Sequence, residues 1–299
     1  MSPLADKVHW TERRSVLKLA VTRLVLLAGI VQVTEFGCIA LITYALETPV
    51  RDLFSKPLAA LLPFVVPAIL AAFAVYWLGV RIIEKRRVRE LALDQAFSYF
   101  ALGAGTGFLL FGSVFGTLWD KGYATYEGYL GLDELPSAAL IFAANVVFEE
   151  LVFRGAIFRI VEDSLGTTLA LAVSALLFGL SHLANNGATL VSALSVAVAG
   201  GITFGLTYTL TKSLWLPMGI HFGWNFTQGA VFGSAVSGYE PRGALKFRLA
   251  GPSLVTGGAF GPEASVYTIL FAIILAAGLC TLAYRRGRWI KLHFQMRFA

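Results

Sequence analysis

The feature that most constrains the fold of this chain is a series of long apolar stretches, each close to the length of a membrane-spanning helix. They lie at roughly 23–46, 58–83, 96–119, 137–160, 168–184, 190–211, 214–236 and 265–284. A helix needs about 20 consecutive apolar residues to cross a bilayer. The chain is 57% hydrophobic and 14% charged, whereas soluble domains carry about 25% charged residues. We therefore predict an all-α polytopic membrane protein with about eight transmembrane helices.

The distribution of positive charge predicts the orientation of these helices. If the N-terminus is cytoplasmic, 18 of the 24 Lys and Arg residues fall in inner segments. Lys and Arg are enriched in the cytoplasmic connections of membrane proteins. We therefore expect both termini in the cytoplasm and a bacterial-type inner or plasma membrane. The net charge of +6 then reflects topology and contact with anionic lipid, and we predict no nucleic-acid partner.

The connections between the apolar stretches are short, and the chain shows no internal repeat. Residues 1–299 are therefore predicted to form a single integral-membrane domain. The charged inner connection 84–95 is expected to be helical. The glycine-rich connection 237–264 contains "TGGAFGPE", which either caps a site from the outer side or forms a flexible turn. The two cysteines, Cys38 and Cys280, give no disulfide framework and no metal-site spacing.

Polar side chains inside the apolar stretches are few, and most of them fall in one part of the chain. A charged group at the bilayer centre costs at least about 2.5–3.5 kcal/mol on insertion, so such a group is a candidate for function. Apart from isolated Ser, Thr and Gln, these residues are Glu35, Asn145, Glu149, Glu150, Arg154, His182, His221 and Asn225. All but Glu35 lie within 137–236, which we predict to hold an intramembrane polar site.

The positions of these residues predict that three helices bring them together. The fourth and fifth stretches form a hairpin whose turn is near 163–168. Glu149 and His182 are equidistant from this turn and lie about 20 Å from it at 1.5 Å per residue. His221 and Asn225 share a helix face, at depths of about 12 Å and about 18 Å. We therefore expect these side chains to face one another, around water, and not to face lipid.

Two neighbouring carboxylates are expected to have different partners. Glu150 precedes Arg154 by four residues, which is the favourable order for an ion pair on a helix. Glu149 lies about 100° around the helix from Glu150, so it can face the site while Glu150 faces Arg154. Outside this group, Glu35 is predicted to be a buried structural or cavity residue, and Asn145 to form hydrogen bonds between helices.

Three short motifs occur in a fixed order on separate apolar stretches. "EELVFR" (149–154) matches EExxxR, "FGLSH" (178–182) matches FxxxH, and "HFGWN" (221–225) matches HxxxN. In this order they resemble the CPBP family, which contains type 2 CAAX prenyl endopeptidases and bacteriocin-processing enzymes. The resemblance implies an intramembrane endopeptidase whose protease-like core lies at about 137–236. Its substrate would be a membrane-associated protein or peptide, and its other partner the lipid bilayer.

Carried over residue by residue, the resemblance also implies roles for the polar side chains. Glu149 would activate a water molecule, and His182 would help to hold that water. His221 and Asn225 would stabilise the oxyanion. The residues that would support the site are Glu150 and Arg154.

A metal-dependent mechanism is the alternative to direct activation of water by a carboxylate. Two histidines and a carboxylate can bind zinc with a water molecule in the fourth position, and here the ligands would be Glu149, His182 and His221. The sequence contains no HExxH motif, and Asn225, nearly level with Glu149, is a good oxyanion donor but a poor zinc ligand. We therefore expect a mechanism without an obligatory metal cofactor.

Two other classes of function compete with the peptidase, and a purely structural role for the polar cluster is a third alternative. In a proton-coupled transporter, the buried Glu and His residues would relay protons, although the chain shows no paired interrupted helices in two halves. A catalytically silent scaffold or immunity-type protein would keep the residues without turnover. Polar residues in a membrane bundle can also act only as interhelical hydrogen bonders.

Overall fold

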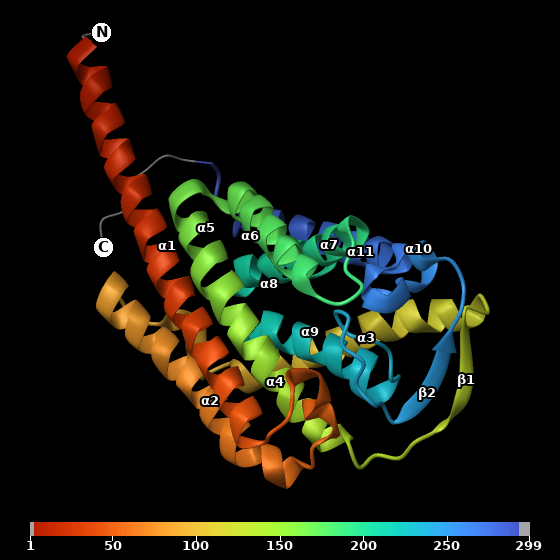
Figure 1. Ribbon diagram of the computed structural model, residues 1–299. Helices are drawn as coiled ribbons and strands as arrows, with labels where there is room; N and C mark the ends of the chain where they lie inside the picture. The colour runs from red at the N-terminus through yellow and green to blue at the C-terminus, as the bar shows by residue number, and fades with distance from the viewer. Residues whose placement is uncertain (1–2, 293–299) are drawn as a thin grey trace.

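Long helices dominate the computed structural model, which describes residues 3–292 (Figure 1). Within these residues, seven helical segments are long and apolar enough to cross a membrane. Their bounds are Leu19–Ala45, Leu58–Glu84, Ala96–Asp120, Leu135–Leu165, Thr167–Ala184, Leu190–Thr211 and Val266–Arg285. Each agrees within a few residues with a predicted stretch. The prediction of an all-α polytopic membrane protein is therefore confirmed.

Several of these segments consist of more than one helical element. The first three correspond to α1 (Pro3–Ala45), α2 (Leu58–Gly79) with the π-helical η2 (Val80–Glu84), and α3 (Ala96–Asp120). The fourth combines α4 (Leu135–Glu150), η4 (Leu151–Phe158) and α5 (Arg159–Leu165). The others are α6 (Thr167–Ser181) with η5 (His182–Ala184), α7 (Leu190–Val196) with η6 (Ala197–Ile202) and α8 (Thr203–Thr211), and α11 (Val266–Arg285).

The predicted stretch 214–236 does not form an eighth helix of full membrane length. It contains α9 (Trp215–Asn225), which has 11 residues, and the six-residue π-helix η7 (Phe226–Val231). After η7 the chain turns at Gly233, where φ is +62°. Most α9 side chains are buried, because α3, α4 and α8 pack around this helix. Its apolar sequence therefore reflects burial in protein.

Helices α3 and α9 pack against each other along their backbones. Gly103 and Gly107 on α3 face Gly219 and Gly223 on α9. A Cβ atom added at any of the four would overlap the backbone of the other helix. Small residues spaced four apart allow this close approach of membrane helices. The packing fixes the position of α9, which carries the predicted site residues His221 and Asn225.

The connection 84–95, which is inner by the predicted orientation, is not helical, contrary to the prediction. Lys85 has φ of +53°, and the only regular element described in the connection is the 3-10 turn η3 (Arg89–Leu91). Ion pairs hold this connection instead. Arg86 binds the carboxylates of Glu84 and Glu90 at 2.8 Å and 2.6 Å, and Arg159 on α5 reaches Glu84 at 2.8 Å. These ion pairs therefore determine the conformation of the connection, although its residues favour a helix.

The segments predicted to lie on the outer side also contain structure that was not predicted. Strands β1 (Ala124–Tyr129) and β2 (Leu245–Leu249) form an antiparallel pair beside the end of α3 (Figure 1). The chain between β2 and α11 forms α10 (Ser253–Thr256) and two 3-10 turns, η8 (Gly258–Phe260) and η9 (Pro262–Ala264). Another 3-10 turn, η1 (Val50–Ser55), connects α1 with α2. The connection 237–264 thus contains regular elements. We call it the outer cap, after its predicted side of the membrane.

Candidate active site

Glu150, Arg154 and His221 form a hydrogen-bonded group at the centre of the protein, in which Glu150 Oε2 and Arg154 Nε have no hydrogen-bond partner among the described residues. Arg154 Nη1 donates to Glu150 Oε1 at 2.9 Å, and neither side chain is exposed. His221 Nδ1 lies 2.9 Å from the same Oε1 atom. Because an ionised carboxylate only accepts hydrogen bonds, Nδ1 must carry the proton. The Nε2 atom of His221 is therefore the nitrogen left for the site.

Arg154 is held by a backbone carbonyl and by two aromatic rings. Its Nη2 atom donates to the carbonyl oxygen of Gly200 at 2.9 Å. The guanidinium carbon lies 4.3 Å from the ring centroid of Phe178 and 4.9 Å from that of Phe204. Stacking on aromatic rings stabilises a desolvated guanidinium. A Cβ atom at Gly200 would lie 2.5 Å from the Phe178 ring, so the glycine is needed for this packing.

Glu149 points in a different direction from Glu150 and faces a cavity. Its Oε1 atom accepts a hydrogen bond of 2.9 Å from Asn145 Nδ2. Its Oε2 atom has no hydrogen-bond partner among the described residues and lies 3.8 Å from His221 Nε2. Asn145 was expected to connect two helices, but it orients Glu149 within its own helical segment. The free Oε2 atom is the one available for a proton.

His221 lies much closer to Glu149 than the depth estimate predicted. That estimate separated the two residues by about 8 Å along the membrane normal at 1.5 Å per residue. The 3.8 Å contact shows that the estimate was wrong. It assumed straight α-helices parallel to the membrane normal, whereas α9 crosses the α4–α5 segment (Figure 1). In addition, π-helical turns directly follow both Glu150 and Asn225, and such turns often occur at functional sites.

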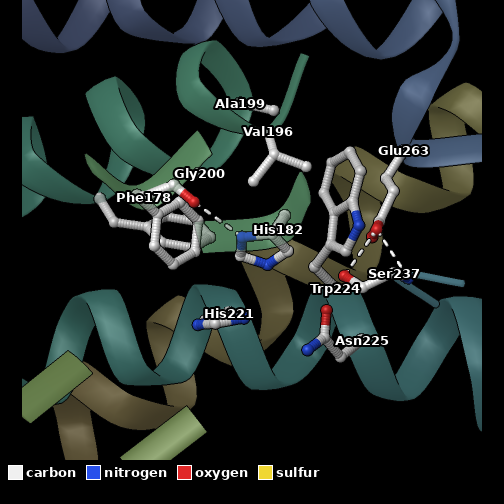
Figure 2. Close-up of a pocket in the computed structure, with 11 residues that line it drawn as sticks. Phe178, His182, Val196, Ala199, Gly200, His221, Trp224, Asn225, Ser237 and Glu263 are labelled. Atoms are coloured by element: carbon white, nitrogen blue, oxygen red, sulfur yellow. Dashed lines mark hydrogen bonds between the residues drawn. The ribbon is translucent and has the colours of Figure 1, made fainter. Parts of the chain in front are cut away.

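His182 completes the group from the end of α6. Its Nδ1 atom lies 2.7 Å from the carbonyl oxygen of Phe178, which can only accept a hydrogen bond. Nδ1 therefore carries the proton, and Nε2 is the nitrogen left for the site. Figure 2 shows His182 across from His221 and Asn225 on α9. Like the two α9 residues, His182 is more than nine-tenths buried.

Two cavities meet at these side chains. The larger has a volume of about 460 Å³ and is mostly apolar, with walls from α1, α2, α4 and the chain after η7. The smaller has a volume of about 40 Å³ and lies toward α7, η6 and the outer cap. Four residues line both, namely His182, His221, Asn225 and Ser237. Glu149 faces only the larger cavity.

Two acidic residues outside the three motifs also line these cavities. Glu35 on α1 lies in the wall of the larger cavity, where Gln32 Nε2 donates to its Oε2 atom at 2.5 Å. Glu263 on η9 lines the smaller cavity. The sequence analysis missed Glu263 because it is in an outer connection rather than an apolar stretch. Its position within "TGGAFGPE" was the only available signal.

Comparison with known families identifies the segment that holds this site. Residues 131–227 match the family model described as Type II CAAX prenyl endopeptidase Rce1-like. The match covers about a third of the chain, and we call these residues the Rce1-like segment. The Rce1-like segment contains all three motifs, and the predicted resemblance is therefore confirmed over these residues. The family is one of proteases, which supports peptidase activity at the family level. Neither the curated proteins nor the solved structures include a match to the chain.

The same geometry bears on the zinc alternative. Within residues 3–292, no three His, Cys, Asp or Glu side chains are grouped closely enough to hold a metal ion. Three donors nevertheless face the larger cavity, namely Glu149, His182 and His221. Their described arrangement does not fit a zinc site, in which all ligand atoms lie within about 2.0–2.2 Å of one point.

Proposed function

We propose that this protein is an intramembrane endopeptidase in which Glu149 activates a water molecule to hydrolyse a peptide bond. The substrate is a membrane-associated protein or peptide, whose apolar part enters the larger cavity from the lipid. The observation that carries the proposal is the free Oε2 atom of Glu149. This atom is 3.8 Å from His221 Nε2, and both residues line the apolar cavity.

The arrangement of acceptors supports activation of water. If both rings are neutral, His182 and His221 present Nε2 lone pairs to the site, because their Nδ1 atoms are hydrogen-bonded elsewhere. A water molecule can then donate one hydrogen to Glu149 and the other to His182. Its oxygen is thereby aimed at a carbonyl carbon bound in the larger cavity. A carboxylate within hydrogen-bond reach of the proton it removes is a suitable general base.

The reaction then proceeds in two steps. Glu149 takes one proton from the water as the oxygen bonds to the carbonyl carbon, and the carbonyl oxygen becomes an oxyanion. Asn225 donates a hydrogen bond to this oxyanion. His221 does so as well while the proton taken by Glu149 resides on its Nε2 atom, 3.8 Å from Glu149 Oε2, before that proton goes back to Glu149. The carboxylate of Glu150 at Nδ1 stabilises that doubly protonated ring. Glu149 finally returns the proton to the amide nitrogen, the carbon–nitrogen bond breaks, and a carboxylic acid and an amine are released.

We propose further that both termini are cytoplasmic, in a bacterial-type inner or plasma membrane. Residues 1–299 would act as a single integral-membrane domain. The proposed mechanism requires no metal. Purified protein should therefore retain activity in a strong chelator, and its activity should not depend on its zinc content. Loss of activity on chelation, with recovery on adding zinc, would instead support zinc bound by Glu149, His182 and His221.

The proposal is tested by comparing membranes that contain the wild-type protein with membranes that contain Glu149→Gln. Quantitative analysis of protein termini should find at least one membrane-associated protein whose cleavage product is lost in the variant. The loss should occur at equal accumulation of both proteins in the membrane. Unchanged termini would instead indicate the silent scaffold or the transporter. A cleavage that persists in Glu149→Gln would contradict the role of this carboxylate.

A further inference from the structure

Glu263 is a buried carboxyl group that the mechanism above does not use. It lies on η9, in the outer cap, and is 6% exposed. The backbone carbonyl of Glu263 accepts a hydrogen bond from Ser195 Oγ on α7 at 2.5 Å. Figure 2 shows its side chain at the edge of the smaller cavity, close to Ser237. The residue therefore brings the outer cap into contact with the site.

Ser237 fixes the orientation of this carboxyl group. The backbone nitrogen and the Oγ atom of Ser237 both donate to Glu263 Oε1, at 2.7 Å and 2.8 Å. Ser237 achieves this with φ of +49°, a conformation that costs a non-glycine residue about 1–3 kcal/mol and is concentrated at functional sites. The neighbouring Gly238 has φ of +81° and packs directly on the backbone of Asn186. The surrounding structure thus enforces the strained conformation of Ser237, whereas glycine adopts positive φ readily.

The smaller cavity is large enough for water. Its volume of about 40 Å³ exceeds the roughly 10–15 Å³ that one water molecule requires. Glu263 faces only this cavity, and Glu149 faces only the larger one. The two carboxyl groups therefore line different cavities, which share His182, His221 and Asn225. A substrate that fills the larger cavity would leave the smaller one as a place for water.

The environment of Glu263 favours its neutral form. No Lys or Arg lines either cavity among the described residues. Burial raises the pKa of Glu263 above its ordinary value, although the hydrogen bonds from Ser237 and the charges of His182 and His221 oppose this rise. A neutral carboxyl group has one O–H donor.

We propose that Glu263 is a positioning residue whose neutral carboxyl group, oriented by Ser237, donates a hydrogen bond to water in the smaller cavity beside His182. It keeps water on this side of the site while substrate occupies the other, and presents that water to the Nε2 atom of His182. This inference rests on the proposed peptidase function. It assigns the outer cap a part in supplying the water that each turnover consumes.

The test uses the full chain in detergent or lipid and the substrate identified by terminal analysis. Glu263→Gln keeps an oxygen for both Ser237 donors and an N–H donor for water, but it cannot ionise. Glu263→Ala removes the hydrogen bonds to Ser237 and to the water molecule. The matched control is Glu127→Gln on β1, which changes an exposed carboxylate outside the cavities. For each variant, kcat, KM, the melting temperature and the pH profile of kcat are measured.

Glu263→Ala should lower kcat about tenfold or more with KM within about twofold, a smaller loss than the roughly 10²–10⁴-fold of a direct acid–base group. Glu263→Gln should keep kcat within about threefold, since its amide mimics the neutral carboxyl group. In the wild type, kcat should fall as pH rises through the pKa of Glu263. In Glu263→Gln, this alkaline loss should shift upward or disappear. The control should match the wild type throughout.

The proposal is overturned if Glu263→Gln loses as much activity as Glu263→Ala, or if Glu263→Ala keeps wild-type kcat. If Glu263→Ala does not fold, the pH profile of Glu263→Gln decides. A loss of kcat at alkaline pH identical to that of the wild type would then be enough to overturn the proposal. Glu149→Gln, measured in parallel, separates this inference from the proposed function. An active Glu149→Gln refutes the peptidase mechanism, whereas an inactive one with unaffected Glu263 variants refutes only the water-positioning role.

Discussion

At the scale of single residues, Arg154 has a structural role and Glu149 a chemical one. Arg154 is fully buried and binds Glu150 and the Gly200 carbonyl. Arg154→Ala leaves Glu150 buried with its charge unpaired, so we expect the free energy of unfolding to fall by about 3–5 kcal/mol. Glu149→Ala should be milder, because Glu149 has no cationic side chain paired with it at hydrogen-bond distance. Melting temperatures of the two variants in detergent decide this, and equal values would contradict the structural role.

Glu90 in the inner connection gives a prediction about acid stability. Burial alone would raise the pKa of Glu90, but the hydrogen bonds from Arg86 and the charge of Arg159 lower it below its ordinary value. A lowered carboxyl pKa stabilises the folded state above the unfolded pKa, and the stability is lost as pH falls through the folded pKa. Glu90→Gln should therefore melt at a lower temperature than the wild type at pH 7. Its melting temperature should also fall less on acidification below about pH 4.

Melting curves between pH 3 and pH 7 measure the Glu90 effect, with Glu134→Gln as the control. Glu134 is half-buried and pairs with the exposed Arg242 at 3.3 Å, and an ion pair near the surface contributes about 0–1 kcal/mol. The control should follow the wild type at every pH. Parallel curves for Glu90→Gln and the wild type would show that Glu90 does not account for the acid sensitivity.

The residues of the site differ in how far the sequence could predict them. Glu149, His182 and His221 could be found because a charged or imidazole side chain is expensive in an apolar stretch. Glu263 could not, because its outer connection is not apolar and only the folded chain brings it to His182. Asn145 was found, but its partner was not, because its contact with Glu149 depends on rotamers that residue spacing does not fix.

At the scale of elements, the contact of α3 with α9 determines where two site residues lie. A Cβ atom at Gly107 would overlap the carbonyl oxygen of Ile220 on α9. Gly107→Ala should therefore push the helices apart, lower the free energy of unfolding by about 1–3 kcal/mol, and reduce kcat by displacing His221 and Asn225. Gly105→Ala on the same helix is the matched control, because nothing lies within 4 Å of its added Cβ atom.

Gly105→Ala should be neutral or stabilising by up to about 1 kcal/mol, since alanine is the better helix former. Denaturation in detergent and kcat for both variants test this pair. If Gly107→Ala matches Gly105→Ala in both measurements, the close packing is not needed to hold α9.

The elements themselves were predicted well where apolar length decides them and poorly elsewhere. Among the described residues, the bounds of seven helical segments agree with the predicted apolar stretches, because a membrane-spanning helix needs a continuous apolar surface. The stretch 214–236 looked the same, since a helix surrounded by protein is as apolar as one surrounded by lipid. The connection 84–95 has helix-forming residues, but its charges pair with Arg159 on α5, and such tertiary contacts are not visible in local sequence.

At the scale of the whole molecule, the site depends on parts of the chain outside the Rce1-like segment. Helices α1 and α2 lie side by side against α4 (Figure 1) and form one wall of the larger cavity. The outer cap contributes Ser237 and Glu263 to the lining of the smaller cavity. We therefore propose that the Rce1-like segment supplies the chemistry, whereas the added helices select what reaches it. An apolar cavity of about 460 Å³ suits a lipid-embedded segment or lipid group of a substrate.

Filling this cavity should block the substrate without damaging the fold. Ala68 on α2 is 5% exposed and lines the cavity, so the ring of Ala68→Phe has room to enter it. We expect KM to rise about tenfold or more, equivalent to about 1.4 kcal/mol of lost binding, with the melting temperature unchanged. Ala59→Phe is the matched control, because Ala59 is exposed on the same helix. Kinetics with the identified substrate that leave KM of Ala68→Phe at the wild-type value would show that substrate does not bind in this cavity.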